Sequence, residues 1–248
     1  MSAALISELG AIVGQDNVLT GDGVAPMATD VFRAGEMPIG VVRPASVEQL
    51  QAVVAAAAKH ETRFTVRGGG ASYTDGYISR DAGQLLIDMG GLNRIVEINP
   101  TDGYVTVEAG VTWAQLREEL AKQGLRTPFW GPFSGLRATI GGSMSQHSIS
   151  HGSALYGITA DSAMSFDVVL ADGSLLSTGT ASAGAKPFMR HFGPDLTGLF
   201  TGDCGSLAVK ARVTLPVITP RPAHRVISFS FPTFEAMHDS MRLIAREK

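Results

Sequence analysis

One segment constrains the fold more than any other: a β-type run that passes directly into three consecutive glycines. Residues 63–67 read Arg-Phe-Thr-Val-Arg, and residues 68–72 read Gly-Gly-Gly-Ala-Ser. Aromatic and β-branched residues favour a strand in the first run. Because no regular element favours three glycines in a row, the chain must leave that strand in a tight loop. Such a loop lets successive backbone N–H groups converge on an anion, as in a phosphate-binding nest.

Two further runs of small residues permit close backbone approach, and several such loops suit a long ligand. Residues 138–143 read Ala-Thr-Ile-Gly-Gly-Ser, and residues 202–207 read Gly-Asp-Cys-Gly-Ser-Leu. Each loop also has a simpler interpretation: a flexible turn for the glycine triplet, a helix start packed on a strand for the second run, and a plain turn for the third. The glycine triplet matches neither the Rossmann nor the Walker A spacing.

Helix and strand signals around these loops predict an α+β chain. Two helices carry capping boxes, Ser46 with Gln49 and Thr112 with Gln115, and the second is expected to stop at Gly124. We expect strands that pair as hairpins rather than a parallel doubly wound sheet. The expected strands are a β-meander of residues 85–89, 94–98 and 104–108, a hairpin of 165–170 with 174–177, and a strand over 207–215.

The C-terminal part reads as one strand, residues 225–231, and one amphipathic helix, residues 233–248. A lone strand and helix cannot bury their apolar faces unaided. We therefore expect this part to begin a second domain, which another chain completes or which docks on the first. The apolar face of the helix consists of Phe234, Met237, Met241 and Ile244.

Composition excludes several classes of function. Twenty basic and 23 acidic residues give a net charge of -3, which implies no general attraction to nucleic acid or an anionic membrane. The single cysteine, Cys204, excludes an internal disulfide framework and a multi-cysteine zinc site, and favours a reducing, cytoplasmic location. No apolar run is long enough to predict a membrane span.

In their order and spacing, eight short segments of the chain resemble the N-terminal flavin-binding domain of the vanillyl-alcohol oxidase and p-cresol methylhydroxylase family of FAD-dependent oxidoreductases. The resemblance covers about residues 40 to 220. Each piece alone is common, and the ordered set is specific. The pieces are residues 44–48, 67–72, 107–111, 138–142, 156–157, 169–173, 195–196 and 202–207.

The resemblance implies a fold of two α/β subdomains with FAD extended between them. It implies a PCMH-type FAD-binding domain over 1–220, with subdomains of about 1–100 and 101–220, and the incomplete start of a cap or substrate domain over 221–248. Residues 68–72 would wrap the pyrophosphate with backbone amides. The full set of expected FAD contacts is Arg67, Gly68, Gly69, Gly70, Ala71, Ser72, Pro128, Ser134, Thr139, Gly142, Ser143, Ser145, Gln146, Gly157, Gly205 and Val209.

Departures from the family pattern bear on the chemistry. Relatives that tether the flavin through histidine carry it where this chain has Ala71, and no cysteine stands at 132–135, so we expect non-covalent FAD. No catalytic residue is identified. His147 and His151 are candidates, because four-residue spacing could place both on one helical face as a base or part of a metal site. Loop or core hydrogen bonding is their alternative role, and no metal is expected.

The resemblance implies a flavin-dependent oxidase or dehydrogenase. Its substrate would be an alcohol, a 2-hydroxy acid or a phenolic or sugar-type compound, oxidised by hydride transfer to FAD. Because family chains are about twice as long, we expect a split, heteromeric enzyme, active only with a partner polypeptide that carries the rest of the cap. The alternative is a non-catalytic FAD-binding or electron-transfer subunit of a multisubunit dehydrogenase. A third interpretation is a reductase similar to the enolpyruvyl-glucosamine reductases.

Overall fold

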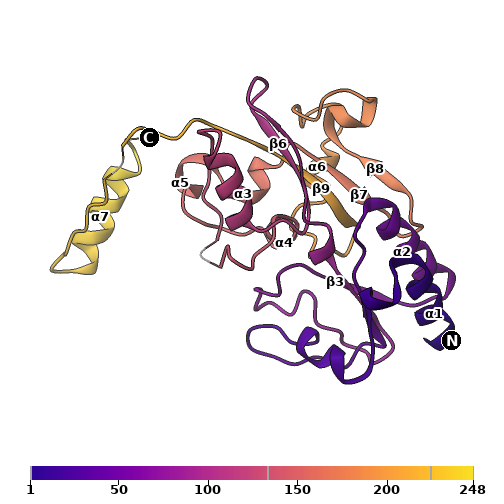
Figure 1. Cartoon of the computed structure of the whole chain (residues 1–248). Helices are drawn as coiled ribbons and strands as arrows, with labels where there is room; N and C mark the ends of the chain where they lie inside the picture. The colour runs from indigo at the N-terminus through magenta and orange to yellow at the C-terminus, as the bar shows by residue number, and fades with distance from the viewer. Residues whose placement is uncertain (1, 133, 224, 248) are drawn as a thin grey trace. The chain divides into compact units, whose positions relative to one another are not determined.

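The computed structural model describes residues 2–132, 134–223 and 225–247, and the chain divides into two compact units, 1–218 and 219–248. The larger unit contains two sheets (Figure 1). The first has four strands in the order β1-β2-β4-β3. Strands β2, β4 and β3 are parallel, and β1 runs antiparallel to β2. The strands are β1 (Val18–Leu19), β2 (Gly40–Val42), β3 (Phe64–Arg67) and β4 (Leu85–Asp88).

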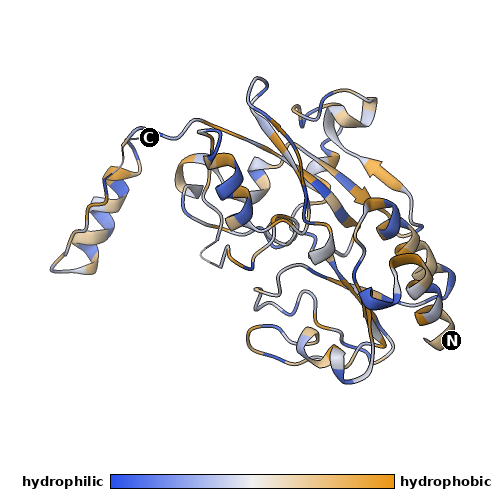
Figure 2. Ribbon diagram, viewed as in Figure 1, coloured by the Kyte–Doolittle hydropathy of each residue, from blue (hydrophilic) through white to orange (hydrophobic). Residues whose placement is uncertain are grey.

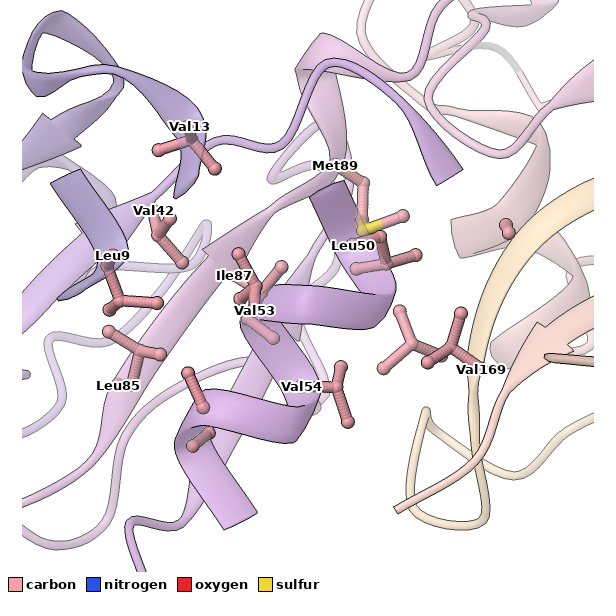
Figure 3. Close-up of a cluster of buried hydrophobic side chains, with 14 of the residues drawn as sticks. Leu9, Val13, Val42, Leu50, Val53, Val54, Leu85, Ile87, Met89 and Val169 are labelled. Carbon is pink, nitrogen blue, oxygen red and sulfur yellow. The ribbon is translucent and has the colours of Figure 1, made fainter. Parts of the chain in front are cut away.

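Two helices, α1 (Ser2–Val13) and α2 (Val47–Lys59), build a core with this sheet. Figure 3 shows side chains of both helices beside Leu85 and Ile87 of β4. Val169 from the second sheet belongs to the same cluster, so the two sheets share core side chains.

The β-meander expected over residues 85–108 is wrong. Strand β4 lies between β2 and β3, and all four of its residues are buried, so it has no free edge for the next strand. A 3₁₀ turn at Met89–Gly91 then redirects the chain. The next two strands, β5 (Ile95–Asn99) and β6 (Tyr104–Glu108), pair with each other in the second sheet.

The second sheet is antiparallel throughout, in the order β5-β6-β9-β7-β8. The predicted hairpin and the predicted strand before residue 216 are confirmed as β7 (Ser165–Val169), β8 (Leu175–Ser177) and β9 (Val209–Pro216). Helices α3 (Trp113–Ala121) and α4 (Ile140–Ser145) contribute to the core of this sheet. The mixed α+β class predicted from the sequence is confirmed.

At both predicted helix starts, only one of the two hydrogen bonds of a capping box is formed. Ser46 accepts a hydrogen bond from the Gln49 amide, and Thr112 accepts one from the Gln115 amide. The glutamine side chains bond elsewhere, that of Gln49 to the Ala45 amide and that of Gln115 to a loop carbonyl. The shorter helical elements of the larger unit are η1 (Gln15–Asn17), η2 (Gly21–Met27), α5 (Ser153–Tyr156), η4 (Thr159–Ser162), η5 (Gly179–Ala183) and α6 (Leu196–Leu199).

The smaller unit contains helix α7 (Phe234–Ile244), which Thr233 caps. Figure 2 shows that α7 carries both hydrophobic and hydrophilic residues, and none of its residues is buried. The strand expected over residues 225–231 is not formed. A strand requires a hydrogen-bonded neighbour, and no described strand pairs with this segment.

Candidate functional site

Three segments far apart in the sequence line one cavity of about 850 Å³ in the larger unit. They are the glycine loop after β3, the segment that contains α4, and the turn that leads into β9. Apolar side chains such as Val66 and Met89 line other parts of the wall. The size lies within the range that cofactor and small-molecule sites occupy.

The glycines of the first loop have a packing role as well as an expected ligand role. A Cβ atom on Gly69 would overlap the backbone carbonyl of Arg137, and a Cβ atom on Gly68 would overlap the hydroxyl of Thr139. The absence of side chains therefore lets the two loops touch. A hydrogen-bonded bridge of Ser72, Thr74 and Gln146 joins the same loops, with the Thr74 hydroxyl donating to Gln146 Oε1 at 2.8 Å.

The backbone amides of the glycine loop are available to a ligand. The N–H groups of Gly69, Gly70, Ala71 and Ser72 donate to no acceptor within the part of the chain that the structure describes. All four residues line the cavity. Consecutive unused amides at a glycine-rich turn form the nest geometry that binds anionic oxygens.

Arg67, at the end of β3, places a buried positive charge against this loop. The residue is 8% exposed, and its guanidinium contacts Gly70 and lies 5.5 Å from the ring centroid of Tyr77. Its Nε atom is buried without a hydrogen-bond partner, and no described carboxylate forms an ion pair with it. Burial also raises the pKa of the Tyr77 phenol. Because burying an uncompensated cation is unfavourable, this charge favours an anion nearby.

The α4 segment offers side chains rather than amides. Thr139 caps the helix by accepting from the Gly142 amide at 3.3 Å, and the amides of Ile140 and Gly141 bond to the carbonyls of Val111 and Ala109. These donors are occupied by the protein itself. Contacts from this side would therefore come from partly buried polar side chains such as Ser145 and Gln146, which line the cavity.

The turn before β9 completes the wall. Cys204 and Gly205 line the cavity, and the Cys204 amide donates to the Ser145 carbonyl at 3.0 Å. Asp203 orders the turn, because its Oδ1 atom accepts from the Gly205 amide at 3.1 Å. Lys210 on β9 forms an ion pair with the same oxygen at 2.5 Å.

The structure brings most of the predicted contact residues to this one cavity. All of them line it except Arg67, Pro128 and Gly157. Arg67 lies against the loop, as described above. Gly157 follows α5, and Pro128 lies where its carbonyl faces Gly152.

The expectation of a helical histidine pair is wrong. Helix α4 ends at Ser145, and His147 has a positive φ of 48°, which directs the chain out of the helix. The His147 ring packs against Gly202, whereas His151 lines the cavity and its carbonyl accepts from the Trp130 amide at 2.8 Å. No cluster of three or more metal-binding side chains occurs among residues 2–132, 134–223 and 225–247.

Sequence reasoning missed several wall residues. Val31 reaches the cavity because its amide donates to the Ser72 carbonyl at 3.3 Å, and Met89, Ala109 and Lys210 arrive from separate strands and turns. Strand β9 alternates Lys210 and Arg212 with apolar residues, as a strand with one polar face does, so its pattern does not single out Lys210. No local pattern indicates the other three.

Comparison with known proteins identifies the family. The FAD binding domain family matches residues 38–179, more than half of the chain. The chain belongs to the FAD binding domain family. The chain is 27% identical over 226 residues to the glycolate oxidase subunit GlcD of Escherichia coli K12, covering 90% of this chain and 44% of that protein.

Two further matches extend this result. D-lactate dehydrogenase [cytochrome], mitochondrial, of Arabidopsis thaliana is 31% identical over 208 residues, which cover 84% of this chain and 35% of that protein. The crystal structure of p-cresol methylhydroxylase with substrate bound matches with a TM-score of 0.77 at 24% identity, covering 89% of this chain and 44% of that one. The chain therefore spans less than half the length of these relatives. Across the described segments, no helix combines the length and apolarity that crossing a membrane requires.

Proposed function

We propose that this chain binds FAD non-covalently in the cavity and forms the flavin-binding part of an oxidoreductase that acts on a 2-hydroxy acid. The observation that carries the proposal is the pairing of four unused amides, from Gly69 to Ser72, with the buried and uncompensated cation of Arg67. A pyrophosphate satisfies both at once, because its oxygens accept from the amides and its charge neutralises the guanidinium.

The remaining wall fits the rest of an FAD molecule. Apolar residues such as Val66, Met89 and Val209 suit a planar heterocycle, and the hydroxyl and amide groups of Ser145 and Gln146 suit its polar edges. When bound, the flavin supplies the hydride-accepting ring. This chain would hold and orient that ring. His151 is the candidate base because it lines the cavity, and His147 is not placed there.

The names of the relatives support the substrate class. Glycolate and D-lactate, which occur in the names of two matched proteins, are both 2-hydroxy acids. Ala71 occupies the position of the histidine tether, so release of intact FAD by acid is expected.

We also propose that a partner polypeptide completes the substrate domain. The support is the face of α7 formed by Phe234, Met237, Met241 and Ile244, which has no buried residue, together with the word subunit in the name of a relative. The partner would cover that face. The single cysteine supports placement of the assembly in the cytoplasm.

The test is anaerobic reduction of the FAD-loaded protein by a panel of 2-hydroxy acids, with and without the candidate partner. Bleaching of the flavin absorbance by one of these acids only in the presence of the partner supports the proposal. Bleaching by this chain alone would contradict the need for a partner. Absence of bleaching by every 2-hydroxy acid, with chemical reductants still effective, would favour an electron-transfer subunit.

A further inference from the structure

A β-bulge gives Lys210 an unusual position in the second sheet. In the pairing of β7 with β9, Asp167 lies opposite Arg212 and Val168 lies opposite Lys210, so Ala211 has no partner. A bulge of this kind changes the face to which the following side chains point. Lys210 consequently shares a face with Val168 and Phe166, both members of the hydrophobic core of this sheet.

The lysine is buried there with a single counter-ion. Its side chain is 3% exposed, and that of Asp203 is 1% exposed. The ammonium donates to Asp203 Oδ1, the one hydrogen-bond acceptor that it has among the described residues. Asp203 Oδ2 is buried and has no hydrogen-bond partner among the described residues. Burial lowers the pKa of the Lys210 ammonium, as expected for a charge removed from water.

A contribution to the stability of the fold does not explain this ion pair well. A buried ion pair is often no more stabilising than apolar residues of similar volume, and an incompletely hydrogen-bonded pair is less so. The Lys210 ammonium also lies 5.9 Å from the ring centroid of Phe166. Apart from the bond to Asp203, its N–H groups have no oxygen or nitrogen acceptor among the described residues, which indicates a missing acceptor. Lys210 also lines the cavity, next to Ala208 and Val209.

The charge of the pair restricts what that acceptor can be. Asp203 already neutralises Lys210, so a second anion would be attracted by the ammonium and repelled by the carboxylate. An uncharged acceptor, such as a ring nitrogen or ring carbonyl, has no such conflict. Arg67, which has no carboxylate partner in the described chain, is the better neighbour for a phosphate.

We propose that Lys210 is a cofactor-binding residue whose ammonium, neutralised by Asp203, donates a hydrogen bond to an uncharged acceptor atom on a heterocyclic ring of the cofactor. This inference rests on the proposed binding of FAD. Both the adenine and the flavin ring present such acceptors, and the experiment distinguishes them.

The test compares three proteins: wild type, Asp203→Asn, and the double variant Lys210→Met with Asp203→Asn. The double variant removes both charges together, so it leaves no unpaired ion in the core. Asp203→Asn keeps the lysine donor and an acceptor for the Gly205 amide. A matched control, Lys122→Met with Glu119→Gln, removes an exposed ion pair on α3.

Binding of FAD and of ADP is measured by titration, with circular dichroism to verify folding. The double variant is expected to bind FAD at least about tenfold more weakly than wild type. Asp203→Asn removes the counter-ion but keeps the lysine donor, so it should lose less affinity than the double variant, and the α3 control should retain wild-type affinity. An equal loss for ADP assigns the contact to adenine. A loss for FAD alone, with a shift of the flavin absorbance bands, assigns it to the flavin ring.

Two results would overturn the inference while leaving the proposed function intact. One is unchanged FAD affinity in the folded double variant. The other is an equally large loss in Asp203→Asn, which would give the pair a purely structural role and which remains measurable if the double variant fails to fold. Wild-type protein that binds no FAD would instead refute the proposed function, and the inference with it.

Discussion

The indole Nε1 of Trp113 donates a hydrogen bond of 2.7 Å to the hydroxyl of Ser143, and both side chains are almost completely buried. This bond joins the first residue of α3 to the middle of α4, the helix that includes most of the second small-residue run. Trp113 also packs edge to face on Phe129, with ring centroids 4.8 Å apart. Ser143, which we expected to contact FAD, therefore also positions α4.

Trp113→Phe should lower the free energy of unfolding by about 1–3 kcal/mol, because the Ser143 hydroxyl is left buried without its donor. Urea denaturation measures this loss. Ser143→Ala should cost a similar amount, and the double variant should cost less than the sum of the two. Strict additivity of the two losses would show that the bond contributes nothing.

Gly69→Ala should destabilise the protein by about 1–3 kcal/mol, because the added methyl group meets the Arg137 carbonyl and must separate the two loops. FAD binding should weaken in parallel. Gly83→Ala is the matched control, since a Cβ atom at this exposed position meets no atom within 4 Å. Equal thermal unfolding temperatures for the two variants would contradict the contact.

Arg67→Met should separate stability from binding. Removal of an uncompensated buried cation should leave the apo protein at least as stable, whereas FAD affinity should fall by at least about tenfold. Arg63→Met, which removes an exposed charge at the start of the same segment, should change neither property. Unchanged FAD affinity in Arg67→Met would show that the guanidinium does not contribute to FAD binding.

Acid should weaken the contact between α1 and α2. Hydrogen bonds from His60 and Lys59 lower the pKa of Glu8 from its ordinary value of 4.5. A carboxyl group with a lowered pKa stabilises the fold above its unfolded pKa, and this contribution is lost as the pH falls through the folded pKa. Glu8→Gln should therefore show a flatter decline of the urea midpoint below about pH 4.5 than wild type. Parallel declines would show that the Glu8 contacts are not formed in solution.

Local signals in the sequence predicted local structure well. The caps at Ser46 and Thr112 form, and strand β6 spans the predicted residues Tyr104–Glu108. Strand partners were less predictable. Strand β4 carries four buried residues whose pattern does not reveal whether its neighbours run parallel or antiparallel, and the assignment to a meander failed for this reason.

The site was predictable where it consists of contiguous loops, and less so elsewhere. The glycines and serines at 68–72 and 142–145 indicate, from the sequence alone, that a ligand or another segment approaches the backbone closely there. The position of Lys210 depends on a bulge at Ala211, and that of His147 on a left-handed backbone angle. Neither is encoded in a short pattern, because both arise from how distant segments pack.

The most direct test of the central claim is an absorbance spectrum of the purified protein, recorded before and after acid precipitation. We expect a yellow protein whose flavin appears in the supernatant as intact FAD, one molecule per chain. A colourless protein that takes up no FAD when the cofactor is added would contradict it.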